Sequence, residues 1–373
     1  MLVPFEEKSV ENKLVAVAMS GGVDSSVSAL ILKKQGYRVI GIFMRNWDEP
    51  NSELCTAAED YDDVAATCAK LDIPFYTFDF AKEYRENVFT RFVEEYKLGL
   101  TPNPDILCNR EIKFKVFYEK ALELGADFIA TGHYCQVQDG RLYKGLDAGK
   151  DQTYFLYAID GKTLKRTLFP IGAMQKSEVR ALARAHDLPT HGKKDSTGIC
   201  FVGERKFPDF LSQYVQRHAG DFCTSDGAVV GQHQGAPFYT MGQRKHLGLG
   251  GPGNPWYVIG KNLERNIVYV AREHDHPALL SSELEAIEEN WIAGIAPQLP
   301  LRCYAKIRYR QEDQACLVSR LEDGKLHVQF DTKQRAIAPA QSVVFYNADG
   351  ECLGGAIVAN PTPQSASTIA ARR

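Results

Sequence analysis

A chain of 373 residues is too long for one compact hydrophobic core, so its length predicts two or three domains. Its 44% hydrophobic and 24% charged residues are typical of a soluble globular protein, and no apolar run approaches the roughly 18 residues of a membrane span. A net charge of −3 gives no general signal for nucleic-acid binding, so an RNA partner would have to bind local basic patches.

The first residues and the cysteines indicate the compartment. Residues 1–13 are mixed and acidic and lack the basic start and apolar core of a signal peptide, which predicts a cytoplasmic protein without a membrane partner. The nine cysteines are an odd number without any C-x-x-C pair, which favours neither a secreted disulfide framework nor a stable zinc or iron–sulfur centre. Most of these thiols are expected to be small buried hydrophobic groups.

A glycine-rich turn joins the first expected strand, 14–19, to the first expected helix, 27–34. The backbone N–H groups at such a junction have no intrahelical partner, and together with the helix dipole they favour an anion. Paired glycines allow close backbone approach, serines add hydroxyl donors, and Asp24 can orient a donor or hold Mg²⁺. An ordinary bend with a serine N-cap could have the same residues. The combination of paired glycines, serines and Asp24 between a strand and a helix nevertheless favours a phosphate site.

The turn Ser20-Gly21-Gly22-Val23-Asp24-Ser25-Ser26 contains no lysine and is not a Walker A loop, and it is not a G-x-G-x-x-G dinucleotide motif. It resembles the loop of the ATP pyrophosphatases (PP-loop enzymes), which cleave ATP between the α and β phosphates. That resemblance implies ATP with Mg²⁺ as co-substrate, AMP transfer and release of pyrophosphate. The residues expected to bind ATP here are Ala18, Met19, Ser20, Gly21, Gly22, Val23, Asp24 and Ser25.

Strands and helices alternate through residues 1–205, which predicts an α/β domain with a parallel sheet and right-handed crossovers. The expected strands are 38–44, 75–80 and 128–134, and the expected helices are 56–70, 82–97, 111–124 and 176–186. The ligand of such a sheet lies at the carboxyl ends of its strands. Met44 at this edge is either an apolar wall for a nucleobase or a core residue. Gly132 permits close approach of a nucleotide, and His133 is a polar group that either acts there or only satisfies structure.

Two loops of this domain carry a cysteine. Two prolines flanking Asn103 predict a stiff non-helical loop that presents Asp105 and Cys108 at the start of the 111–124 helix. Cys108 there is either a stabilised thiolate or a thiol packed under the loop. Cys200 follows two lysines in a basic, glycine-containing stretch, where a thiolate can also persist. Cys200 alone would be interpreted as structural, whereas two loop cysteines beside an ATP site favour a chemical role.

The remaining chain is predicted to be mainly β. The expected strands are 227–232, 237–240, 256–260 and 267–272 in the central part and 302–310, 315–319, 326–330, 342–346 and 356–358 in the last part. Asp139-Gly140 predicts a hairpin over 138–142, and Lys150 to Thr153 are expected to open an apolar helix with Asp151 as N-cap. Asp-Gly turns at 323–324 and 349–350 predict a small C-terminal barrel. The predicted parts are a PP-loop ATP-binding domain at 1–205, a small mixed, mainly β central domain at 206–288, a β-barrel at 289–360 and a disordered tail at 361–373.

Two basic segments are candidates for phosphate contacts. Residues 242–251 form a basic, flexible loop that either follows an RNA backbone or is only solvated. In the expected strand 302–310 the even positions share one face, which is cationic and contains Tyr304.

Several of these stretches, in order, resemble the bacterial tRNA-specific 2-thiouridylases (MnmA family) over residues 14–358. The motifs are Ser20 to Ser25, Asn103-Pro104-Asp105 with Cys108, Ala130 to Tyr134, Lys150-Asp151-Gln152, Lys194 to Phe201, and Gly242 to Lys245. Two positions depart from the family pattern. His246 stands where the family usually has glycine, and Cys135 where alanine is common.

The resemblance implies that ATP adenylates the C2 oxygen of the wobble uridine (U34) in tRNAs for Lys, Glu and Gln, and that a persulfide sulfur displaces AMP. Cys200 would carry the persulfide received from a sulfur-carrier protein. Cys108 would attack it, leaving a transient Cys108–Cys200 disulfide or releasing sulfide, and Asp105 would be the general acid or base. Met44 and Gly132 would contact ATP. The implied tRNA contacts are Asn103, Pro104, Asp105, His133, Lys150, Asp151, Gln152, Arg308, Tyr309 and Gln341.

Two other functions use parts of the same pattern. A PP-loop ligase or amidotransferase would adenylate a small molecule and add nitrogen, and it would tolerate loss of either loop cysteine. An ATP-sensing RNA-binding protein would bind ATP without forming AMP. Neither uses both cysteines or the Asn103-Pro104-Asp105 segment.

Overall fold

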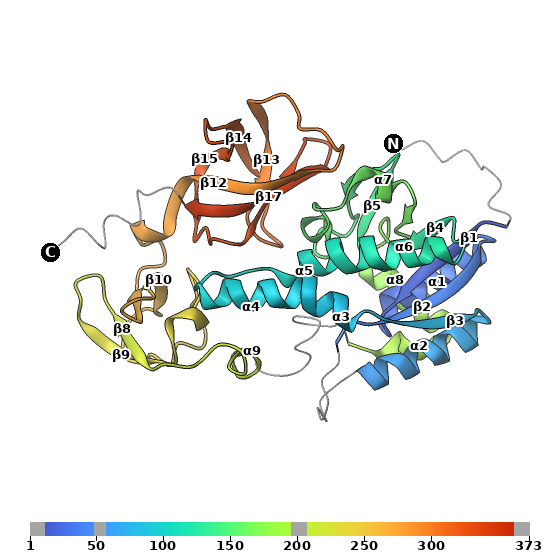
Figure 1. Cartoon of the computed structure of the whole chain (residues 1–373), viewed down its shortest axis with the longest axis horizontal. Helices are drawn as coiled ribbons and strands as arrows, with labels where there is room; N and C mark the ends of the chain where they lie inside the picture. The colour runs from blue at the N-terminus through green and yellow to red at the C-terminus, as the bar shows by residue number, and fades with distance from the viewer. Residues whose placement is uncertain (1–11, 48–56, 195–206, 362–373) are drawn as a thin grey trace.

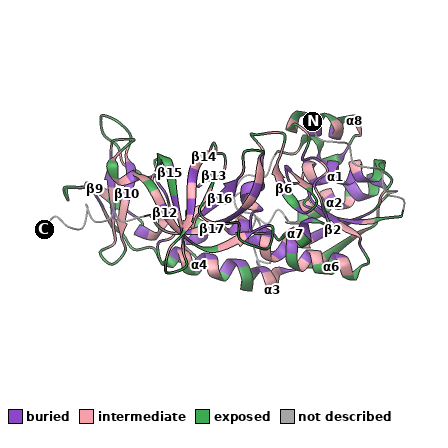
Figure 2. Cartoon of the chain, turned by 90° about the horizontal axis from the view of Figure 1, so that it is seen from above, coloured by how far each residue is buried: buried purple, intermediate pink, exposed green. Residues whose placement is uncertain are grey.

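The computed structural model describes residues 12–47, 57–194 and 207–361. Three sheets of five, four and eight strands organise this part of the chain. They follow one another along the long axis of the molecule, with the C-terminal barrel between the central sheet and the N-terminal sheet (Figures 1 and 2). The predicted fold class is confirmed. No helix of the described ranges combines the length and the apolar character needed to cross a membrane.

The N-terminal sheet is parallel throughout and has the strand order β3-β2-β1-β4-β7. Its strands are β1 (Leu14–Met19), β2 (Arg38–Arg45), β3 (Phe75–Asp79), β4 (Phe128–Ala130) and β7 (Thr167–Leu168). The apolar run of β1 is almost completely buried because helices cover both faces of a parallel sheet. The carboxyl ends of β1, β2 and β4 therefore meet at one edge.

Three helices pack over one face of this sheet. They are α1 (Val23–Lys34), α2 (Ala57–Leu71) and α8 (Lys176–Ala185). The first begins four residues before the predicted start at Val27. Val23 and Val27 lie one turn apart and are both buried, and the hydroxyls of Ser25 and Ser26 donate to the Gly22 carbonyl. Asp24 and Ser25 thus belong to the first helical turn.

Two long helical runs contain π-helical turns. The first comprises α3 (Ala81–Tyr84), a π-turn at Arg85–Phe89 and α4 (Thr90–Lys97), and the second comprises α5 (Pro104–Leu107), a π-turn at Cys108–Val116 and α6 (Phe117–Glu123). The second run begins at Pro104 rather than at the predicted 111, so the prediction of a non-helical loop around Asp105 and Cys108 is wrong. Asn103 explains the early start because its side chain accepts from the Asp105 N–H at 3.2 Å, and Pro104 presets the first helical residue.

The central sheet has the order β10-β11-β8-β9, in which only the β11–β8 pair is parallel. Its elements are α9 (Phe207–Leu211), β8 (Gly220–Cys223), β9 (Val229–His233), β10 (Tyr257–Asn262) and β11 (Ile267–Ala271). Sequence patterns missed β8. They also predicted a strand at 237–240, where the structure has a 3₁₀ turn at Ala236–Phe238.

Six strands close the C-terminal barrel in the order β12-β15-β14-β13-β16-β17, with β17 pairing back to β12. They are β12 (Leu280–Trp291), β13 (Leu301–Lys306), β14 (Gln314–Arg320), β15 (Leu326–Arg335), β16 (Ser342–Tyr346) and β17 (Glu351–Pro361). The predicted hairpin forms as β5 (Cys135–Gln138) and β6 (Arg141–Lys144), and it pairs with β17. This hairpin, which follows the N-terminal sheet in the chain, thus extends the barrel sheet to eight strands.

The predicted helix at Lys150 to Thr153 is wrong, since only a 3₁₀ turn at Thr153–Phe155 forms before α7 (Gly161–Leu164). Asp151 accepts from the Gly145 N–H at 3.1 Å and from the Thr153 hydroxyl at 3.0 Å. Its carboxylate is therefore drawn into the loop after β6 instead of capping a longer helix.

Candidate active site

The turn after β1 is shaped by its glycines. Gly21 adopts φ +70, and a Cβ added there would lie 2.7 Å from the Asp60 carbonyl oxygen of α2. A Cβ on Gly132, at the end of β4, would lie 2.8 Å from the Asp24 carbonyl carbon and the Ser25 nitrogen. Only glycine allows these approaches. The predicted reason for Gly132 was approach of a nucleotide, whereas the contact that the structure describes is with the turn itself.

Asp24 is held by two side chains from distant parts of the chain. Lys176 Nζ, at the start of α8, donates to both carboxylate oxygens at 2.7 and 2.8 Å, and the Tyr134 hydroxyl donates to one of them at 2.8 Å. The Tyr134 N–H in turn donates to Gln152 Oε1 at 2.9 Å. Of the two roles predicted for Asp24, orienting a donor fits this geometry. Sequence reasoning placed Lys176 only at the start of a helix, and no local pattern links it to Asp24.

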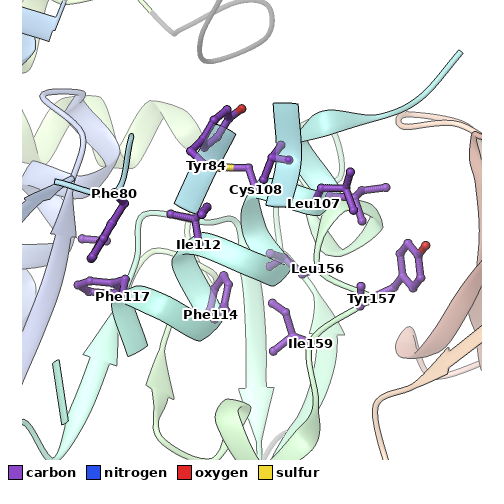
Figure 3. Close-up of a cluster of buried hydrophobic side chains, with 14 of the residues drawn as sticks. Phe80, Tyr84, Leu107, Cys108, Ile112, Phe114, Phe117, Leu156, Tyr157 and Ile159 are labelled. Atoms are coloured by element: carbon purple, nitrogen blue, oxygen red, sulfur yellow. The ribbon is translucent and has the colours of Figure 1, made fainter. Parts of the chain in front are cut away.

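Asp105 and Cys108 lie three residues apart on the helical run that Asn103 begins. Burial raises the pKa of the Asp105 carboxyl, and the nearby Lys113 ammonium offsets part of this rise. Cys108 is 1% exposed and opens the π-helical turn. Its side chain lies among Tyr84, Leu107 and Ile112 (Figure 3). The motif therefore begins a helix. In the free protein the buried Cys108 thiol agrees with the second predicted alternative, a thiol packed among neighbouring side chains.

Cys200 lies outside the described residues, so its distance from Cys108 stays a prediction. The described chain approaches it as far as Lys194. Lys193, one of the two lysines predicted to make that stretch electropositive, forms ion pairs with Asp60 and Asp63 of α2. The charge of this lysine is therefore balanced locally. The seven cysteines that the structure describes are all buried, as predicted for most of the thiols.

Three of the residues predicted to contact tRNA make hydrogen bonds or ion pairs with other residues of the protein. His133 is 9% exposed and its Nδ1 lies 2.7 Å from the Thr131 hydroxyl, and burial holds the pKa of its imidazole well below the ordinary value. The side chain of Asp151 is 5% exposed, with Lys306 Nζ at 3.8 Å. Gln152 Oε1 accepts the hydrogen bond from the Tyr134 N–H. These contacts support positioning roles for the three residues in the free protein.

Barrel residues predicted to contact tRNA lie beside the helical run of Cys108. The Tyr309 ring packs on Phe155 at 4.6 Å, and the Phe155 carbonyl accepts from Asn109 Nδ2 at 3.1 Å. Gln341 Nε2 donates to the Thr101 carbonyl. The barrel therefore contacts the chain directly before Asp105 and, through Phe155, the helical run after it.

The predicted cationic face of 302–310 is wrong in two respects. The strand β13 ends at Lys306, so Arg308 and Arg310 do not continue its alternation, and Arg310 adopts φ +66. Arg302 pairs with Asp331, while Lys306 lies between Asp151 and Asp313. The charges of this strand are thus largely balanced within the protein.

The two departures from the family pattern are accommodated by the fold. His246 adopts φ +62, the left-handed conformation that glycine favours, so the basic loop keeps the backbone shape expected of the usual residue. Cys135 is completely buried in the hairpin, and this burial raises the pKa of its thiol well above the ordinary value. It packs as a small neutral side chain.

Known proteins match the chain over nearly its whole length. Three family models cover it: a tRNA methyl transferase HUP domain at 13–204, a tRNA methyl transferase PRC-barrel domain at 208–272 and an aminomethyltransferase beta-barrel domain at 281–358. The tRNA-specific 2-thiouridylase MnmA of Protochlamydia amoebophila is 56% identical, over 94% of this chain and 94% of that protein. The chain belongs to the MnmA family. The family member from Shouchella clausii is 54% identical, over 94% of this chain and 98% of that protein.

Membership in the MnmA family confirms the family that the motifs predicted and, with it, the predicted class of enzyme. Among solved structures, the U34-tRNA thiolase NcsA from Methanococcus maripaludis is 19% identical. The likeness covers 56% of this chain and 66% of that chain, with a TM-score of 0.37.

Proposed function

We propose that this chain is a tRNA sulfurtransferase that adenylates the C2 oxygen of the wobble uridine with ATP and then replaces AMP by a persulfide sulfur. The relatives named tRNA-specific 2-thiouridylase support tRNA thiolation as the reaction. The turn from Ser20 to Ser25, at the N-terminus of α1, supports the use of ATP with Mg²⁺ as co-substrate. The proposed partners are tRNAs for Lys, Glu and Gln and a sulfur-carrier protein, and the proposed compartment is the cytoplasm.

Adenylation solves a problem of reactivity. The C2 carbonyl of uridine is amide-like and a poor electrophile, but an AMP ester turns its oxygen into a leaving group. Cys200 would carry the incoming sulfur as a persulfide. Attack of the Cys108 thiolate on the Cys200 Sγ breaks the S–S bond, forms a Cys108–Cys200 disulfide and releases hydrosulfide, which adds at C2 and expels AMP. A cellular dithiol would then reduce the disulfide for the next cycle.

The observation that carries the proposal is the shared helix of Asp105 and Cys108. Asn103 caps this helix, so the two side chains are held three residues apart on a rigid element. The pKa of the Asp105 carboxyl is raised by burial, which brings it closer to the range that proton transfer near neutral pH requires. Cys108 is buried in the free protein, and the persulfide of Cys200 would have to reach it there.

The test is nucleoside mass spectrometry of unmodified tRNA incubated with the protein, MgATP and a persulfide donor. We expect 2-thiouridine with the unchanged protein and none with Cys108→Ser or Cys200→Ser. Cys223→Ser, a cysteine of the central sheet, is the matched control and should keep the activity. Thiolation that survives both loop substitutions would contradict the two-cysteine mechanism. AMP formation that needs neither cysteine and gives no thionucleoside would favour the ligase alternative, and ATP binding without AMP formation would favour the ATP-sensing alternative. AMP and pyrophosphate without a thionucleoside would show that the substrate is wrong.

A further inference from the structure

The turn after β1 lacks the lysine that a Walker A loop carries within its own sequence. Polyphosphate binding usually needs a cation as well as backbone N–H groups, because a nucleoside triphosphate carries several negative charges. In the structure an ammonium group lies at this turn, and it comes from α8. Lys176 Nζ is 2.7 Å from one oxygen of Asp24, which is the second residue of α1.

The position of Lys176 is fixed by its own backbone and by its neighbours. It is the first residue of α8, whose start is closed by a reciprocal capping box between Gln175 and Glu178. Its N–H donates to the Asp147 carboxylate at 3.0 Å, and its side chain is 12% exposed. The ammonium also lies 5.6 Å from the centre of the Tyr134 ring. A lysine held in this way loses little further entropy when it binds a ligand.

The charge balance at the turn favours Lys176 over the other lysine nearby. Lys193 is shared by two carboxylates, those of Asp60 and Asp63, so its surroundings carry a net negative charge. Lys176 pairs with the carboxylate of Asp24, and it therefore offsets the charge in the turn that would repel a phosphate.

We infer that Lys176 is the phosphate-binding cation of this site and that Asp24, itself oriented by Tyr134, holds its ammonium at the turn to meet the polyphosphate of ATP. This inference rests on the proposed use of ATP and adds a substrate-binding residue to that site. The fold thus supplies from α8, 152 residues further along the chain, the cation that the turn itself does not contain.

The test compares the affinity of Lys176→Met for MgATP and for adenosine, each measured by titration calorimetry or by competition. Loss of one charge-assisted contact should weaken MgATP binding by about tenfold to a hundredfold, while adenosine, which has no phosphate, binds as before. Lys176→Arg keeps the charge and should recover most of the MgATP affinity. Lys34→Met is the matched control because Lys34 also joins α1 to α8, through His186, but lies at the far end of α1.

Equal weakening of MgATP and adenosine would overturn the inference, since it would indicate general damage to the site, and so would unchanged MgATP affinity. Both measurements need only binding, so they remain decisive if the unchanged protein fails to thiolate tRNA. Selective loss of MgATP affinity without any thiolation by the unchanged protein would keep the role of Lys176 and reject the proposed reaction.

Discussion

The side chains of the candidate site fall into two kinds: some hold other groups in position, and others are suited to take part in the reaction. Gln152, Tyr134, Asp24 and Lys176 form one chain of hydrogen bonds that ends at the turn after β1. Gln152 and Tyr134 would therefore act on the proposed ATP site through Asp24. Asp105 differs from them because its carboxyl is pushed away from its ordinary pKa, which is common for residues that transfer protons.

Asp105→Asn should separate activity from stability. Because burial raises the pKa of this carboxyl in the fold, its contribution to stability is full below the ordinary carboxyl pKa and is lost as the pH rises through the raised pKa. Asparagine never ionises, so at about pH 7.5 the variant should melt on the order of 2 °C higher, with no difference near about pH 4. Thiouridine formation should fall at least about a hundredfold.

Thermal unfolding across pH, together with nucleoside analysis, checks both halves of this prediction. Asp62→Asn removes an exposed carboxylate of α2 and serves as the control, with no change expected in either measurement. A variant that is less stable than the unchanged protein at about pH 7.5 would contradict the argument from burial.

Elements of three regions meet at the short segment before Asn103. Lys261 of β10 donates to the Gly99 carbonyl, and the hydroxyls of Thr101 and Thr240 lie 3.2 Å apart. On the barrel side, Gln341 donates to the Thr101 carbonyl. The central sheet and the barrel thus both fix the start of the helix that carries Asp105 and Cys108.

Gln341→Ala should therefore slow the chemistry rather than weaken tRNA binding. Loss of one hydrogen bond of about 1 kcal/mol should lower kcat for thiolation roughly fivefold, with KM for tRNA little changed. Steady-state kinetics with varied tRNA measures both constants, and Gln329→Ala on the exposed side of β15 is the control. If KM rises while kcat holds, Gln341 is instead a direct tRNA contact, as the family resemblance implies.

At the scale of the whole molecule, the hairpin of β5 and β6, which follows the N-terminal sheet in the chain, pairs with β17 and belongs to the sheet of the barrel. A buried polar cluster accompanies this contact. Lys306 lies 3.8 Å from Asp151 and 3.7 Å from Asp313, and Lys144 pairs with Asp313 as well. The ammonium of Lys306 in the barrel and the carboxylate of Asp151 in the N-terminal half balance each other only when these two parts of the molecule are in contact.

Lys306→Met should loosen the two parts of the molecule. It leaves the carboxylate of Asp151, whose side chain is 5% exposed, without this cation, which should cost about 3 kcal/mol of the free energy of unfolding. Calorimetry should then show a lower and broader transition. Lys325→Met removes a more exposed barrel lysine paired with Glu285 and should cost less than about 1 kcal/mol. Equal effects of the two substitutions would contradict a coupling role for Lys306.

Local patterns in the sequence determined much of this protein. The apolar run of β1 predicted a buried strand with the observed bounds, and the Asp-Gly pair at 139–140 predicted the hairpin, where both residues adopt positive φ. Alternating strands and helices predicted the parallel sheet. These features depend on neighbours in the chain, so composition and spacing are enough. The ordered motifs also predicted the family, which the relatives confirm.

Only the tertiary structure decided which distant groups meet. Strand β12 was missed because its alternation is interrupted by polar residues and becomes favourable only when β15 and β17 pair with it. Asp151 was expected to cap a longer helix, yet its carboxylate accepts from Gly145 and Thr153 and also lies 3.8 Å from Lys306, 155 residues away in the chain. Lys176 meets Asp24 in the same way. A hydrogen bond or an ion pair between such residues depends on how the elements pack, so the local spacing of residues in the sequence does not predict it.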